Sequence, residues 1–405
     1  MREDNQTQIC RKIWNEAKKI ESQLIEFRRD LHRNPELSSQ ESRTAALIAE
    51  RLASLDCRVQ TGVGGYGIVA ELAGSAEGPT IALRADMDAL PIQEETNLPY
   101  ASQVTGVMHA CGHDVHTAVL LGAATILNRF RAHIKGTVRF IFQPAEETLT
   151  GAERMIQEGV LLGVDEIYGL HNLPTLAAGR FAAKSGAFMA AIDRIEMRIQ
   201  GKGGHGSMPD QCIDPIVASA AIIMGIQTAV SREIAPIEPA VVSIGSIHGG
   251  TANNVIPDTV ELTGTVRTFS SEARRQMPGR LQRIAEQIAG GYRCDVEMRY
   301  ISQVPGVVNH DACKENVRRA VELLFDEGHY SEALPTMGGE DFSLYLERVP
   351  GCFFWLGSGN ADGSGVLHGL HSSKYTVDEA CIGYGAALFA ALMADRLGMN
   401  DQNLL

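Results

Sequence analysis

The chain has 405 residues, 44% of them hydrophobic, and this length exceeds the size at which a single hydrophobic core usually stops growing. Its formal net charge of -13 disfavours nucleic acid and anionic membrane as partners, because those surfaces attract clustered Lys and Arg. Residues 1–19 are polar and mixed in charge, without the apolar core of a secretion signal, and no apolar run is long enough to span a bilayer. We therefore expect a soluble, cytoplasmic protein.

The first part of the chain predicts a helix-covered, mostly parallel sheet. Helical spacing of apolar residues over 20–55, interrupted at Asn34 and Pro35, predicts two amphipathic helices. A long helix is expected after His113 and a shorter one near Gly151. Short β-rich runs alternate with these helices, at 80–84, 137–142 and 166–170. Such alternation is typical of an α/β domain.

The middle of the chain has a different pattern, which predicts an inserted domain. The expected elements are a strand, a helix, two strands, a helix and a strand, at 191–199, 214–230, 241–247, 259–267, 271–289 and 294–300. This β-α-β-β-α-β order is that of a ferredoxin-like α+β unit. The earlier pattern resumes with a helix near 311, a strand at 352–356 and a helix at 377–397. We expect a catalytic domain formed by 1–186 and 303–405, with a satellite domain at 187–302.

Several segments place metal-ligand residue types just after predicted strands. The side chains concerned are those of Asp86, Asp88, Cys111, His113, Glu146, Glu147, His171 and, near the C-terminus, His371. Ligand sites in open α/β sheets collect beyond the carboxyl ends of the strands, so we expect these side chains to converge.

The chemistry of this set predicts two metal ions. Cys111, His113, His171, His371 and one of the adjacent pair Glu146 and Glu147 would supply thiolate, imidazole and carboxylate ligands, more than a single metal needs. The other glutamate could act as a base. An alternative is that the cysteine is a nucleophile, but a histidine only two residues away rarely serves as its base.

At this point the sequence resembles the M20 metallopeptidase and amidohydrolase family, in its branch of aminoacylases, hippurate hydrolases and indole-acetyl-amino-acid hydrolases. The resemblance covers nearly the whole chain. The motifs that carry it are 84–91, 108–114, 143–147, 169–172, 201–205, 249–258, 337–342 and 370–371.

The resemblance implies a role for each candidate residue. Cys111 would bridge two metals whose other ligands are His113, Glu147, His171 and His371. Glu146 would be the general base. Asp88 would orient a ligand histidine through the imidazole nitrogen that does not bind the metal. His205 of the satellite domain would act on the substrate, and Asn254 and Arg267 would hold its carboxylate. The roles of Asp86, Glu340 and Asp341 stay open.

The resemblance also implies an activity, a cofactor and an assembly. The expected reaction is metal-dependent hydrolysis of an N-acyl amino acid to a carboxylic acid and a free amino acid. A dipeptidase or an N-carbamoyl amino acid hydrolase with the same two-metal site is the alternative. Zinc is favoured, with manganese, cobalt or nickel able to replace it. A homodimer or homotetramer is expected, and the acyl group stays open.

Overall fold

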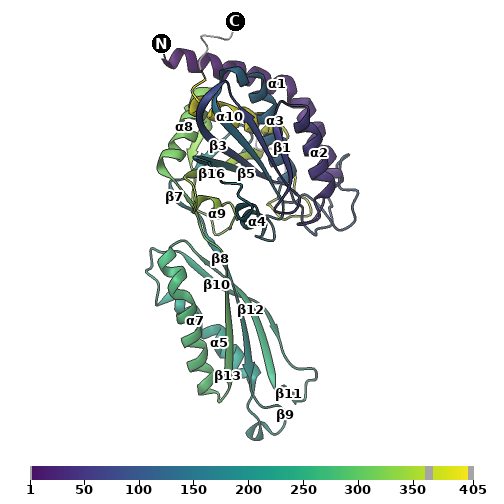
Figure 1. Ribbon diagram of the computed structural model, residues 1–405. Helices are drawn as coiled ribbons and strands as arrows, with labels where there is room; N and C mark the ends of the chain where they lie inside the picture. Colours follow the sequence, from purple (N-terminus) through teal and green to yellow (C-terminus); the bar gives the residue numbers. More distant parts are fainter. Residues whose placement is uncertain (1, 361–367, 400–405) are drawn as a thin grey trace. The chain divides into compact units, whose positions relative to one another are not determined.

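The chain divides into two compact units (Figure 1). The computed structural model describes residues 2–360 and 368–399. The first unit comprises Met1–Gly186, Val308–Leu334 and Asp341–Leu405, and the second comprises Ala187–Val307 and Pro335–Glu340. The last long strand of the second unit, β13 (Asp295–Val304), runs two residues past the boundary expected at 302.

An eight-stranded sheet forms the centre of the first unit, in the order β1-β2-β4-β3-β5-β16-β6-β15. The strands are β1 (Arg58–Val63), β2 (Gly67–Ala73), β3 (Ala76–Asp86), β4 (Lys135–Gln143), β5 (Glu166–Ala177), β6 (Phe181–Ala183), β15 (Tyr330–Glu332) and β16 (Gly351–Gly359). The four central strands β4, β3, β5 and β16 are parallel to one another. This confirms the predicted α/β sheet, to which the antiparallel strands β1 and β2, missed by the sequence patterns, add one edge.

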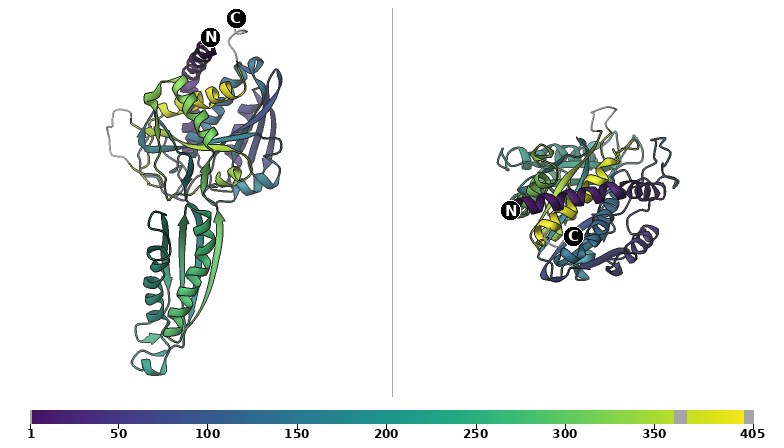
Figure 2. Two further views of the ribbon diagram at one scale, coloured as in Figure 1. Left: turned by 90° about the vertical axis from the view of Figure 1, so that its left-hand side faces the viewer. Right: turned by 90° about the horizontal axis from the view of Figure 1, so that it is seen from above.

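One large hydrophobic core joins this sheet to its helices. Figure 2 shows the sheet and the helices of this unit in two further views. The helices in this core are α1 (Arg2–Arg33), α2 (Ser42–Ala53), α3 (His113–Arg129), α8 (Asp311–Leu324) and α10 (Ala380–Arg396). Helix α3 is buried almost all round, because it packs against α1, α10 and the sheet, and its sequence is correspondingly apolar. Two short helices, α4 (Gly151–Gln157) and α9 (Ser343–Leu346), pack on each other. Within the described residues, no helix has both the length and the apolar character needed to cross a membrane.

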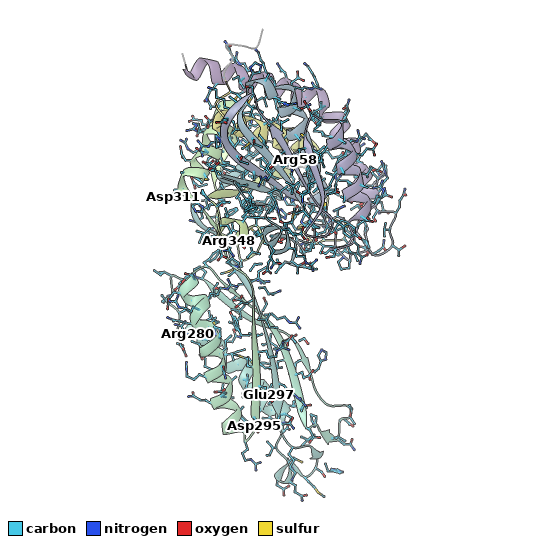
Figure 3. All side chains as sticks on the ribbon, viewed as in Figure 1. Arg58, Arg280, Asp295, Glu297, Asp311 and Arg348 are labelled. Atoms are coloured by element: carbon cyan, nitrogen blue, oxygen red, sulfur yellow. The ribbon has the colours of Figure 1, made fainter. Side chains whose placement is uncertain are left out.

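The second unit is a four-stranded antiparallel sheet with helices on one face. Its strands follow the order β10 (Ala240–His248), β12 (Thr259–Thr268), β8 (Ala191–Gln200) and β13, and its main helices are α5 (Pro215–Gly225) and α7 (Ser271–Gly291). Alternate residues of β8 are buried against these helices, whereas Asp295 and Glu297 of β13, labelled in Figure 3, are exposed. This confirms the predicted ferredoxin-like unit.

One predicted helix of the second unit is interrupted. The expected helix over 214–230 is divided into α5 and α6 (Gln227–Ser231). The break follows Gly225, where an added Cβ would lie 2.1 Å from Cδ1 of Ile288 on α7. The close approach of the two helices therefore favours glycine, a poor helix former, at this position.

Candidate metal centre

The candidate ligands of the first unit gather at the carboxyl ends of its central strands. Asp86 is the last residue of β3, and Glu146 follows the end of β4 by three residues. Cys111 immediately precedes the N-cap of α3, and His113 is the first residue of that helix. His371 is tied to the same loop, since its backbone N–H donates to the carbonyl of Ala110 over 2.8 Å.

The sequence predicted a strand that ends at residue 170, just before His171. In the structure His171 lies within β5. The strand extends to Ala177 because β16 runs beside it, with Trp355 paired to His171 and Gly359 paired to Ala177. His171 therefore lies in the regular part of this ladder, which runs from Ile167 to Leu173 before its register shifts.

The candidate ligand atoms form five overlapping groups within the described residues, and two of these groups contain Cys111. Those of Cys111, His113 and His171 lie within 4.8 Å of one another, and so do those of Cys111, Glu147 and His371. Sγ of Cys111 is 3.3 Å from Nε2 of His171, and Oε1 of Glu147 is 3.4 Å from Nε2 of His371. The cysteine is common to both groups, which is the arrangement that a bridging ligand requires.

Unsatisfied buried atoms at this place fit a metal. Among the described residues, Nε2 of His113 and Oε1 of Glu147 make no hydrogen bond, although both atoms are inaccessible to solvent. They lie 3.8 Å apart, and Oε2 of Glu146 is 4.0 Å from the same imidazole nitrogen. A buried polar atom without a partner is costly, and a divalent cation would satisfy both atoms at once. Thiolate, imidazole and carboxylate are the ligands that zinc accepts.

Asp88 connects three parts of the centre. Its Oδ1 lies 3.2 Å from Nδ1 of His113, and its Oδ2 accepts hydrogen bonds from the Ser38 hydroxyl at 2.6 Å and from the backbone N–H of Glu147 at 3.0 Å. The carboxylate thus turns Nε2 of His113 toward the cluster and fixes the backbone of Glu147. This is how an outer carboxylate orients metal ligands.

Burial and neighbouring charges set the protonation of the centre. Burial raises the pKa of the Cys111 thiol well above its ordinary value. Burial by itself would lower the pKa of His113, but the charges of Asp86 and Cys111 raise it well above the usual range. Burial and the nearby His116 lower the pKa of His171 well below its ordinary value. A cation bound here would displace the protons that these shifts favour on Cys111 and His113.

Asp86 is engaged by other side chains. Arg84 donates to its Oδ2 over 2.7 Å, and Nδ1 of His116 lies 2.6 Å from its Oδ1. The same arginine donates to Asp341 over 2.9 Å, and all four side chains in this chain of contacts are buried. Asp86 and Asp341 thus flank one buried guanidinium, whose single positive charge stabilises both carboxylates.

Sequence reasoning missed two residues of the centre, His116 and Asn172. His116 follows His113 by three residues, so both lie on one face of α3, and this helical spacing was the available signal. Asn172 had no signal beyond its position next to His171. Its contacts become visible only when strands and loops far apart in sequence are brought together.

Two backbone positions at the centre have positive φ without being glycine. Ala145, which precedes Glu146, has φ 54°, and His371 has φ 63°. Side chains with a Cβ are disfavoured there by about 1–2 kcal/mol. The surrounding contacts impose these conformations, including the hydrogen bond from the Ala145 N–H to Oε1 of Glu41 at 2.9 Å.

The second unit holds His205, Asn254 and Arg267. His205 lies on the short strand β9 (Gly204–His205), which pairs with β11 (Val255–Ile256), and the N–H of the next residue donates to the Asn254 carbonyl over 2.8 Å. His205 and Asn254 are therefore neighbours. Arg267 lies on β12, and burial lowers the pKa of its guanidinium. Its Nη1 is buried and, within the described part of the chain, makes no hydrogen bond.

The comparison with known protein families agrees with this geometry. The model of Peptidase family M20/M25/M40 matches residues 82–395. The chain belongs to the M20 family. It is accordingly a hydrolase that acts on amide bonds.

Relatives and a solved structure extend this M20 assignment over almost the full length. The chain is 46% identical to the N-acetylcysteine deacetylase of Bacillus subtilis, covering 93% of this chain and 97% of that protein. It is 41% identical to thermostable carboxypeptidase 1 of Saccharolobus solfataricus, covering 95% and 98%. The crystal structure of the Bacillus subtilis YXEP protein, described as a dinuclear metal-binding peptidase from the M20 family, superposes with a TM-score of 0.82 at 43% identity, covering 94% and 99%.

Proposed function

We propose that this M20 hydrolase cleaves N-acyl amino acids to a carboxylic acid and a free amino acid. The observation that carries the proposal is the position of Cys111 in both ligand groups, with Glu146 beside them. Two of the relatives support the substrate class. A deacetylase of an N-acetyl amino acid and a carboxypeptidase both cut an amide at the nitrogen of an amino acid whose carboxylate is free.

Two divalent metal ions are the proposed cofactors. Cys111 would bridge them, and their other ligands would be His113, His171, Glu147 and His371. Bound there, the metals would polarise the amide carbonyl and lower the pKa of a water molecule. We expect zinc from the thiolate and imidazole donors, with manganese, cobalt or nickel able to replace it.

The chain's own residues supply the proton transfers. Glu146 would accept a proton from the attacking water and return it to the departing amide nitrogen. His205 would donate a hydrogen bond to the oxygen that becomes negative during attack. Arg267, whose Nη1 makes no hydrogen bond within the described residues, would hold the substrate's carboxylate, with Asn254 beside His205 as a second contact.

Assembly through the second unit is also proposed, as a homodimer or homotetramer. Helix α5 is apolar around its circumference, with Ile216, Val217 and Met224 exposed, the last to 75%. Strand β10 is at the edge of its sheet, where it has a neighbouring strand on one side only. An exposed apolar helix surface and an exposed edge strand are each typical of an interface. The cytoplasmic location is supported by the cysteines, all eight of which are free.

The test is hydrolysis of a substrate panel by enzyme stripped with a chelator and reloaded with single metals. The panel contains N-acetyl, N-benzoyl and indole-acetyl amino acids, dipeptides and N-carbamoyl amino acids. Metal-restored release of amino acid from the N-acyl compounds is expected. Cleavage of dipeptides or carbamoyl compounds alone would replace the proposed substrate class with the alternative one.

A further inference from the structure

Asn172 is connected through each of its polar groups to a different part of the centre. Its side-chain Nδ2 donates to the carbonyl of Cys111 over 2.6 Å, and its own carbonyl accepts from Nδ1 of His171 over 2.8 Å. Its Oδ1 accepts from the hydroxyls of Ser358, at 3.1 Å, and Tyr375. The residue is fully buried. A buried amide with all of its groups paired can fix several segments at once.

His116 holds the backbone of Asn172 from the other side. The Asn172 N–H donates to Nε2 of His116 over 2.9 Å, so this nitrogen is an acceptor. The remaining nitrogen, Nδ1, lies 2.6 Å from Asp86 and donates to it. Both ring nitrogens are therefore engaged, and His116 acts as a bridge between β3 and β5 and not as a metal ligand.

The loop that carries Cys111 is pressed directly against this amide. A Cβ added to Gly112 would lie 2.2 Å from Nδ2 of Asn172 and 2.5 Å from Oη of Tyr375. Gly112 also has φ 90°, which favours glycine. The Asn172 side chain thus fixes the position of the loop that carries Cys111.

We propose that Asn172 is a positioning residue that sets the spacing between Cys111 and His171, and with it the affinity of the centre for its metals. One residue contacts the peptide group of the first and the imidazole of the second, whose ligand atoms lie 3.3 Å apart. His116 and Tyr375 hold the amide in the orientation that does this. The inference rests on the proposed two-metal function.

The test compares Asn172→Asp with Asn309→Asp by metal binding instead of turnover. Asn309 is a matched control, because it is also buried in the first unit and its Nδ2 donates to two backbone carbonyls, of Lys184 and Phe353. Asn172→Asp places a carboxylate oxygen against the Cys111 carbonyl. We expect metal affinity, from chelator competition with Zn²⁺, to fall about 10–100-fold. The cysteine-to-metal absorption band of the Co²⁺-loaded protein should shift as well, whereas Asn309→Asp lowers the melting temperature and leaves both readouts unchanged.

Wild-type affinity and an unchanged Co²⁺ spectrum in Asn172→Asp would overturn the inference, as would an equal loss of affinity in Asn309→Asp. If Asn172→Asp does not fold, the double variant Tyr375→Phe with Ser358→Ala decides, because it removes both hydroxyls that hold Oδ1 of Asn172. A smaller loss of affinity with a shifted spectrum supports the inference, and no change contradicts it. A wild-type chain that binds no metal would reject the proposed function itself, together with this inference.

Discussion

Nδ1 of His205 lies 2.9 Å from the hydroxyl oxygen of Ser207 and 3.2 Å from its backbone nitrogen. A backbone N–H can only donate, so Nδ1 is the acceptor. A neutral His205 ring must then carry its proton on Nε2. The free nitrogen of this exposed histidine is therefore a hydrogen-bond donor, as its proposed role toward a developing oxyanion requires.

Ser207→Ala should lower kcat modestly. The variant keeps the backbone donor to His205 and loses only the hydroxyl, a bond worth about 1 kcal/mol, which corresponds to roughly a fivefold loss. Steady-state kinetics with an N-acetyl amino acid measure it, and Ser207→Thr, which retains a hydroxyl, is the control. A wild-type kcat in the alanine variant would show that the hydroxyl does not fix the ring.

Glu146→Gln should lower kcat strongly and leave the metal content of the centre unchanged. The amide cannot accept a proton, and a general base contributes about 10²–10⁴-fold to a rate. Metal content, measured by inductively coupled plasma mass spectrometry, should stay at the wild-type level. Loss of metal together with activity would instead make Glu146 a ligand.

Metal removal should destabilise the first unit selectively. A cation at about 100 times its dissociation constant contributes about 2.7 kcal/mol to the folded state, and the proposed ligands all belong to that unit. Differential scanning calorimetry with and without a chelator should show one transition shifted downward. In Cys111→Ala the chelator-dependent shift should be much smaller, and a shift of wild-type size would remove the cysteine from the proposed ligand set.

Arg28→Ala should be strongly destabilising. Nε of Arg28 lies 2.7 Å from Oδ2 of Asp114 on α3, and both side chains are buried. Removing the arginine leaves a buried carboxylate without this partner, which costs about 3–5 kcal/mol. Arg29→Ala is the comparison, since Arg29 pairs with Glu379 at a more exposed position and should cost about 1 kcal/mol or less. Urea unfolding measures both, and equal losses would argue against the buried pair.

The pair of Arg28 and Asp114 also predicts how the free energy of unfolding falls at acid pH. Burial alone would raise the pKa of Asp114, but Arg28 and His32 hold it well below its usual range. Below pH of about 4 the unfolded side chain takes up a proton and the folded one does not, so stability falls as pH decreases. Arg28→Met should make this fall shallower. Urea midpoints between about pH 3 and 6, with chelator in every sample, test the slope, and identical slopes would contradict the assignment.

The sequence predicted those features that follow from local patterns, such as the order of helices and strands and the residue types that follow a strand. The β-α-β-β-α-β order identified the second unit, and ligand residue types after strands identified the region of the centre. Strands β1 and β2 were missed, although the apolar run of β2 between Gly67 and Gly74 was a strand signal. Their place at the sheet edge depends on pairing with β4, which the sequence does not show.

The contacts behind the ligands could not be read from the sequence. Asn172 and Tyr375 are 203 residues apart, and Arg84 and Asp341 are 257 apart, yet each pair makes a buried hydrogen bond. Residue type limits which partners a side chain can take, but only the folded chain selects among them. This is also why the role of Asp86 stayed open until the structure showed its contacts with Arg84 and His116.

The extension of β5 past His171 limits how this enzyme can be altered. Successive residues of a strand face opposite sides, so one residue inserted or deleted between Glu166 and His171 would turn the imidazole away from Cys111. Substitutions there change single side chains, whereas a change of length shifts the register of this segment against β16. Libraries made to broaden the acyl group should therefore vary length in surface loops and leave this strand's residue count unchanged.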